Sequence, residues 1–147
     1  MKRCVIDASV SVKWFVDVAE DEQDADVACG LLEQGYAGQC RFIQPSHWIG
    51  EVADVLARLQ PESASRNIDD LLLFNFHSVI SSSAVYRRAI ALAHRLDHHL
   101  FDTLYHAVAL EEKISFITAD RQYFKKARKL GNIVMLDEID RVKVTGK

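Results

Sequence analysis

Short runs of apolar, β-prone residues alternate along the chain with longer stretches whose apolar residues recur every three or four positions. The short runs predict strands over residues 3–6, 41–44, 77–80, 115–118 and 133–135. The longer stretches between them predict helices, and strands joined by helices form parallel sheets covered on both faces. We therefore expect an α/β fold with three layers, α/β/α, around a parallel sheet of four or five strands.

Capping and breaking residues set the expected ends of the helices. Ser9 is a suitable N-cap for a short helix through Trp14. Further helices are expected over residues 20–34, from Pro45 to Pro61, and over 62–74, 84–96, 101–111 and 120–129. Gly35 and Gly38 are expected to end the second helix and Gly131 the last, while the polar residues 97–99 separate two helices.

Length and composition indicate one soluble globular domain over residues 1–147. Apolar residues make up 49% of the chain and charged residues 27%, which argues against disorder. No apolar run approaches the ~20 residues that span a bilayer, and Asp7 interrupts the first run too early for a secretory signal. We expect a cytoplasmic protein without a membrane segment.

Three cysteines, Cys4, Cys29 and Cys40, have no paired spacing and are expected to be free and buried.

Four acidic residues occur where apolar strands end or where helices begin or pack. Asp7 follows the first strand, Glu51 and Asp102 lie in apolar helices, and Asp120 follows the strand that contains Thr118. Groups at the carboxyl ends of parallel strands share one crevice, so these acids are candidates for a single cation site. Helix capping or simple surface exposure would explain each acid singly.

The segments around these acids resemble PIN-domain ribonucleases, and most closely the VapC toxins of bacterial type II toxin-antitoxin pairs. The matching segments are residues 5–14, 44–53, 101–109 and 116–121, in the family's order and approximate spacing. The resemblance implies that Asp7, Glu51, Asp102 and Asp120 are catalytic metal ligands. It also implies supporting roles for Ser9, beside the first acid, and for Thr118.

The same resemblance implies a metal-dependent endoribonuclease that cuts structured RNA such as tRNA or rRNA. Carboxylates repel a phosphodiester unless a hard cation lies between them, and Mg²⁺ or Mn²⁺ can generate hydroxide from water there. Two such ions would change the formal charge from −3 to +1, so the acidic composition does not exclude RNA binding. Lys13, Arg121 and Lys125 are candidate RNA contacts. A cognate antitoxin and a homodimer are the implied protein partners.

Other functions remain open at this point. His94, His98, Asp102 and His106 recur every four residues and would form a zinc-binding stripe on one unbroken helix. Histidine pairs also suggest metal-free cleavage through the 2′-hydroxyl of RNA. An aspartyl-phosphate phosphatase of the HAD type would need a second acid at position 9, where the chain has Ser9. The remaining alternatives are a silent PIN-like scaffold that binds RNA or protein, and a housekeeping nuclease without an antitoxin.

Overall fold

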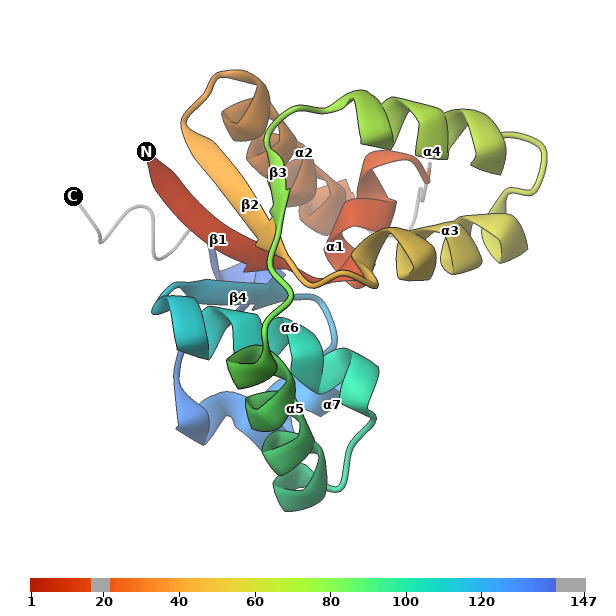
Figure 1. Ribbon diagram of the computed structural model, residues 1–147. Helices are drawn as coiled ribbons and strands as arrows, with labels where there is room; N and C mark the ends of the chain where they lie inside the picture. Colours follow the sequence, from red (N-terminus) through yellow and green to blue (C-terminus); the bar gives the residue numbers. More distant parts are fainter. Residues whose placement is uncertain (17–21, 140–147) are drawn as a thin grey trace.

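Five parallel strands pair in the order β3-β2-β1-β4-β5 at the centre of the molecule (Figure 1). The computed structural model describes residues 1–16 and 22–139 of the chain. The strands are β1 (Lys2–Ile6), β2 (Cys40–Gln44), β3 (His77–Val79), β4 (Ser115–Thr118) and β5 (Ile133–Met135). Each expected strand is therefore present to within one residue at either end, and the parallel sheet is confirmed.

Helices connect successive strands and cover the sheet. They are α1 (Ala8–Ser11), α2 (Glu22–Tyr36), α3 (Trp48–Leu59), α4 (Ala64–Leu73), α5 (Ser83–Leu96), α6 (Leu100–Glu112) and α7 (Arg121–Ala127). Short 3₁₀ segments follow α1 at Val12–Trp14, α7 at Arg128–Leu130 and β5 at Leu136–Glu138. In Figure 1, α2 lies on one side of the sheet and α5, α6 and α7 on the other, while α3 and α4 form a helical hairpin.

Alternate residues of the central strands enter two separate apolar cores. Val5, Ile43 and Phe116 pack into the core that includes side chains of α3, α5, α6 and α7. Ile6, Phe42 and Ile117 pack into the other core, against α2 and the 3₁₀ segment after β5. Because successive side chains of a strand point to opposite faces, these neighbours show that both faces are covered. The expected α/β/α layering is confirmed.

Gly35 does not end α2, contrary to the expectation from sequence. The helix continues to Tyr36, and Gly35 packs against the Phe76 ring, where an added Cβ would lie 2.6 Å from Phe76 Cδ2. Gly38, which has a φ of 71°, follows the helix as expected. The expected beginning of this helix, near residue 20, lies outside the described residues.

Asp97 ends α5 in a left-handed conformation with a φ of 49°, so the polar break before α6 is confirmed. The spacing that suggested a zinc stripe therefore spans two helices rather than one. His106 belongs to the core, since its ring nitrogens lie 2.9 Å from Tyr123 Oη and 2.8 Å from the Gly131 carbonyl oxygen. The single-helix zinc stripe is wrong.

The cysteine expectation holds for two of the three residues. Cys4 and Cys40 are buried free thiols whose sulfur atoms lie 3.4 Å apart, whereas Cys29 is exposed. The prediction that Cys29 is buried was therefore wrong.

Among the described helices, none combines the length and the apolar character needed to cross a membrane.

Candidate metal centre

The candidate site lies where the chain leaves the two central strands. The connection from β1 leads to β2 on one side, whereas β4 pairs with β1 on the other side. Such a reversal of strand order opens a crevice at the carboxyl edge of a parallel sheet. Asp7 directly follows β1, and its backbone N–H donates to the Ile117 carbonyl of β4 at 3.0 Å. The first of the four acids is thereby fixed at the centre of this edge.

Two hydroxyl groups hold the carboxylate of Asp7. Ser9 Oγ and Thr118 Oγ1 both donate to Asp7 Oδ2, at 2.9 and 2.8 Å. These hydroxyls are themselves held, because Ala119 N donates to Ser9 Oγ and Asp120 N donates to Thr118 Oγ1. The loop after β4 therefore orients Asp7 through two hydroxyl side chains.

Ser9 does not cap the first helix, so that expectation was wrong. The N-cap position of α1 is Asp7, with extended φ and ψ of −69° and 153° and no side-chain capping bond. The hydroxyl of Ser9 instead connects Asp7 to the backbone after β4. This contact joins distant parts of the chain, which a local capping rule does not consider.

The charge of Asp7 is disfavoured in the folded protein. Burial raises the pKa of Asp7 to about 6, and the hydrogen bonds from Thr118 and Ser9 oppose that rise. The negative charges of Asp102 and Glu51 raise the pKa further. Two other predicted ligands therefore lie within electrostatic range of Asp7 and disfavour its charge when no cation is bound.

Asp102 and Asp120 meet on the α6 and α7 side of the crevice. Asp102 lies in the first turn of α6, and Asp120 is the N-cap of α7, where its Oδ1 accepts from Tyr123 N at 3.1 Å. One candidate ligand atom from each of His98, Asp102 and Asp120 lies within 4.8 Å of the others. These three residues line a cavity of about 400 Å³ together with Asp97, His99, Gln122 and Lys126.

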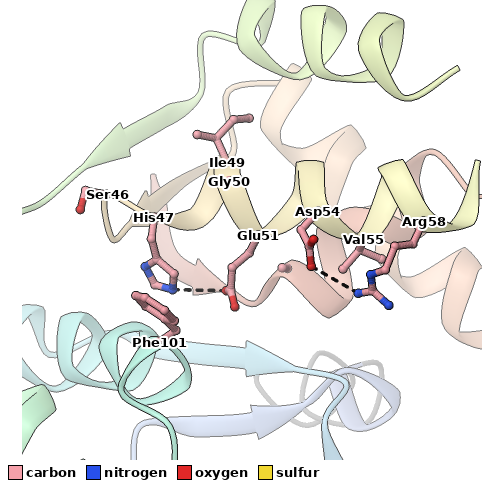
Figure 2. A pocket seen from close by; sticks show the side chains of 10 residues that line it. Ser46, His47, Ile49, Gly50, Glu51, Asp54, Val55, Arg58 and Phe101 are labelled. Carbon is pink, nitrogen blue, oxygen red and sulfur yellow. Dashed lines mark hydrogen bonds and ion pairs between the residues drawn. The ribbon is translucent and has the colours of Figure 1, made fainter. Parts of the chain in front are cut away.

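Glu51 lies on the other side, in a larger cavity of about 640 Å³ next to α3 (Figure 2). His47 Nε2 lies 3.2 Å from Glu51 Oε1, which suits an ion pair when the ring is protonated. The pair lacks hydrogen-bond geometry, and Glu51 Oε1 is buried without a donor from any described residue. A buried carboxylate oxygen without a donor is costly, and a bound cation would satisfy it.

The cavity beside Glu51 reaches the segments that carry Asp7 and Asp102. The cavity beside Glu51 is also lined by Ala8 and Phe101, the sequence neighbours of those two acids. Tyr105 lies near both Glu51 and Asp7. Burial raises the pKa of its hydroxyl most, and the charges of these two acids raise it further. All four predicted acids therefore lie around one edge of the sheet, although the closest described cluster contains only Asp102 and Asp120 with His98.

The three candidate RNA contacts differ in their surroundings. Arg121 pairs with Asp137, so its charge is partly neutralised. Lys125 is exposed on α7, and Lys13 is half-buried in the 3₁₀ segment after α1. An electrostatic contact with phosphate therefore remains a prediction for all three.

His98 and Lys126 lie at this site but were not predicted as part of it. His98 Nε2 lies 2.7 Å from Asp102 Oδ2, and Lys126 Nζ lies 3.3 Å from His98 Nδ1. The four-residue spacing of His98 and Asp102 was a usable signal, although the helix break at Asp97 weakened it. Lys126 had no signal beyond its place in a basic helix.

Comparisons with known proteins agree with this geometry. No curated protein sequence matches the chain. The chain is similar in fold to the crystal structure of PAE2754 from Pyrobaculum aerophilum, with 18% identity and a TM-score of 0.64 over 99% of this chain and 98% of that one. The family model of the PIN domain, generally a metal-dependent nuclease, matches residues 4–130. The match covers most of the sequence, and the chain therefore belongs to the PIN domain family.

Proposed function

We propose that this protein is a Mg²⁺- or Mn²⁺-dependent endoribonuclease that cleaves structured RNA such as tRNA or rRNA. The observation that carries the proposal is the meeting of acids from separate segments at one edge of the sheet: Asp102 and Asp120 share a cluster, and Thr118 connects Asp120 to Asp7. A cluster of partly buried carboxylates has a clear physical role once divalent cations lie among them.

The donor set fits a hard cation. Asp7, Glu51, Asp102 and Asp120 would hold the metal through carboxylate oxygens, which Mg²⁺ and Mn²⁺ prefer. Ser9 and Thr118 keep Asp7 in place through their bonds to Oδ2. When bound, the metal would activate water and stabilise the charge that develops on the phosphate.

The side chains around the acids would position the RNA. Lys125 and Lys13 offer positive charge for phosphate, with a smaller contribution from Arg121 because of its ion pair. Phe101 is 59% exposed beside Asp102, and its ring stacks against His47 at 5.2 Å between ring centroids. Such an exposed ring suits stacking of an unpaired base next to the scissile phosphate.

The metal-free histidine route has less support. It needs two imidazoles that reach the substrate, but His106 is buried with both nitrogens in contact with core groups. His98 faces Asp102 and Lys126 with its two nitrogens. Neither of these two rings therefore offers a free nitrogen for proton transfer. His47 and His99, which line the two cavities, are the imidazoles that this route would have to use.

A toxin role with a cognate antitoxin and a homodimeric state are part of the proposal. Several apolar side chains remain exposed on α2 and on the α3–α4 hairpin: Tyr36, Leu59, Leu72 and Leu73. These exposed apolar side chains are the surface that a protein partner could cover. We also propose a cytoplasmic location, where RNA and antitoxin would both be accessible. A housekeeping nuclease and a silent scaffold are the alternatives.

Mapping of cleavage ends on total RNA tests the proposal. The wild type should cut at discrete sites with Mg²⁺ or Mn²⁺, lose activity in EDTA, and recover it when the metal is restored. Asp102→Ala should abolish cleavage while the circular dichroism spectrum is unchanged. Asp69→Ala is the matched control, since Asp69 is an exposed acid of α4 that lines neither cavity. Cleavage in EDTA that leaves 2′,3′-cyclic phosphate ends would instead support the histidine route.

A further inference from the structure

His98 is almost enclosed between α6 and α7. Its side chain is 8% exposed, and its ring packs edge-on against Tyr123 at 4.9 Å between centroids. The two ring nitrogens face different partners, with Nε2 at 2.7 Å from Asp102 Oδ2 and Nδ1 at 3.3 Å from Lys126 Nζ. Both contacts are within hydrogen-bonding distance, so the identity of the partners decides where the ring proton lies.

Asp102 and Lys126 together set the tautomer of His98, since a carboxylate only accepts and an ammonium only donates. An ammonium group has three donors and no acceptor, so Nδ1 of His98 must accept from it. The proton of the neutral ring then belongs to Nε2, which donates to the carboxylate of Asp102. A doubly protonated ring would place an N–H against the ammonium, donor against donor. A neutral ring with its proton on Nδ1 would also place a donor against the ammonium. Its Nε2 would then have no proton to donate to Asp102.

This tautomer has a direct consequence for metal binding. A histidine binds metal through a nitrogen lone pair, and the Nε2 that faces Asp102 carries a proton instead. His98 is therefore unsuited to be a ligand, even though it lies within 4.8 Å of candidate ligand atoms of Asp102 and Asp120. Its bond to Asp102 can fix the orientation of that carboxylate, as outer groups commonly do around metal ligands.

Lys126 also joins the two helices that carry the ligands. Its ammonium donates to the Asp97 carbonyl at 3.0 Å, next to its contact with His98. Asp97 and His98 form the turn that leads into α6, whereas Lys126 belongs to α7, which Asp120 caps. One lysine thus holds the beginning of the Asp102 helix against the helix that follows Asp120.

We propose that His98, held by Asp102 and Lys126 in the tautomer with its proton on Nε2, is a positioning residue for Asp102 and keeps the metal centre all-oxygen. The inference rests on the proposed function, because it assumes that Asp102 is a metal ligand. It accounts for a histidine inside the acidic cluster without assigning zinc chemistry to the site. It also explains why a hard cation, rather than one that prefers nitrogen, would occupy the cluster.

Nitrogen NMR of the metal-free protein tests the tautomer. Long-range ¹⁵N–¹H spectra should show Nε2 of His98 protonated and Nδ1 unprotonated, with the ring assigned from the His98→Gln variant. Lys126→Met should leave the proton on Nε2, because Asp102 still accepts from that nitrogen, but it should shift the Nδ1 resonance, because the donor to Nδ1 is lost. Lys129→Met, a change at an exposed lysine of the same basic segment, should leave both nitrogen resonances unchanged. A proton on Nδ1 in the wild type would overturn the proposal.

Titration calorimetry with Mn²⁺ tests the positioning role. Loss of an outer-shell partner typically weakens metal binding by about 10–100-fold, which we expect for His98→Leu. His98→Gln should stay within about threefold of the wild type, because its amide can donate to Asp102 and accept from Lys126. His94→Leu, at an exposed histidine of α5, should bind like the wild type. Equal Mn²⁺ affinities for wild type and His98→Leu, or equal losses of affinity in both His98 variants, would refute the positioning role.

Pulsed electron paramagnetic resonance of the Mn²⁺-loaded wild type completes the test. The spectrum should lack the coupling of a directly coordinated imidazole nitrogen, and its presence would show that His98 is a ligand. The proposed function and this further inference can be tested separately. A wild type that binds no Mn²⁺ contradicts the proposed function, whereas a wild type that binds Mn²⁺ with no effect of the His98 variants contradicts only this inference.

Discussion

Thr118 Oγ1 donates a 2.8 Å hydrogen bond to Asp7 Oδ2, joining residues that are 111 positions apart in the sequence. The same oxygen accepts from Asp120 N at 3.0 Å, so one buried hydroxyl connects the first and the last of the predicted ligands. The adjacency of β1 and β4 in the sheet makes this connection possible.

Thr118→Val should weaken metal binding while the fold is retained. The change leaves Asp120 N without an acceptor and removes one of the two donors to Asp7, so we expect a destabilisation of about 1–3 kcal/mol. Affinity for Mn²⁺ should fall about tenfold or more. Thr118→Ser keeps the hydroxyl and is the control. Calorimetry and urea unfolding measure the two effects, and a valine variant with unchanged Mn²⁺ affinity would contradict the connecting role.

Asp7→Asn should stabilise the metal-free protein and abolish cleavage. The pKa of Asp7 is raised in the fold from 3.8 to about 6, mainly by burial, so the folded state binds a proton more readily than the unfolded chain. Stability therefore falls as pH rises from 3.8 through 6. At pH 7–8 without metal, the variant should be about 1–3 kcal/mol more stable than the wild type.

The difference between Asp7→Asn and wild type should disappear below about pH 4, where the aspartic acid is neutral in both states. Asparagine keeps an oxygen that can accept from Ser9 and Thr118, so the hydrogen bonds persist. Addition of Mg²⁺ should raise the melting temperature of the wild type much more than that of the variant. A variant that is less stable than the metal-free wild type at pH 8 would contradict the electrostatic account.

His77 should make the fold sensitive to acid. Burial, and then the charge of Arg41, lowers the pKa of His77 from 6.5 to about 4. The unfolded chain therefore takes up a proton first, and stability falls as pH drops from 6.5 to about 4. Over this pH window the shifted pKa of His77 lowers the free energy of unfolding by about 3 kcal/mol if the full shift applies.

His77→Phe should reduce this acid sensitivity. The imidazole stacks on Trp48 at 4.5 Å between centroids, and both of its nitrogens are buried without a hydrogen bond to described residues. A phenyl ring preserves the stacking and cannot be protonated. Urea unfolding between pH 4 and 7 measures the effect, with His94→Phe as the exposed control. Identical pH slopes for His77→Phe and wild type would show that another group causes the acid sensitivity.

Two glycines of α2 should respond in opposite directions to alanine. A Cβ at Gly35 would lie 2.6 Å from the Phe76 ring, which is buried among other aromatic rings, so Gly35→Ala should destabilise by about 1–3 kcal/mol. A Cβ at Gly30 meets nothing within 4 Å, so Gly30→Ala should stabilise the helix by about 0.5–1 kcal/mol. Urea unfolding of both variants decides the matter, and equal effects would show that the Phe76 contact is unimportant.

Local patterns were sufficient for the strands and for most helix ends. Ser115–Thr118 and Ile133–Met135 have the predicted bounds, because short β-prone runs between polar turns have few alternatives. Gly131, with a φ of 78°, follows the 3₁₀ segment Arg128–Leu130 at the end of α7, where the helix stop was predicted. Gly35 failed as a helix stop because its role depends on Phe76, a residue from another strand connection that no local window contains.

The sequence by itself determined the layered α/β fold and brought forward Asp7, Glu51, Asp102 and Asp120 as candidates, because strand ends and helix beginnings are local features. Only the tertiary structure decided which groups meet them: the hydroxyls of Ser9 and Thr118 at Asp7, and the ring of His98 at Asp102. Hydrogen-bond partners and pKa values depend on distances of a few ångströms between segments, and those distances arise only when the parallel strands pair and the helices pack.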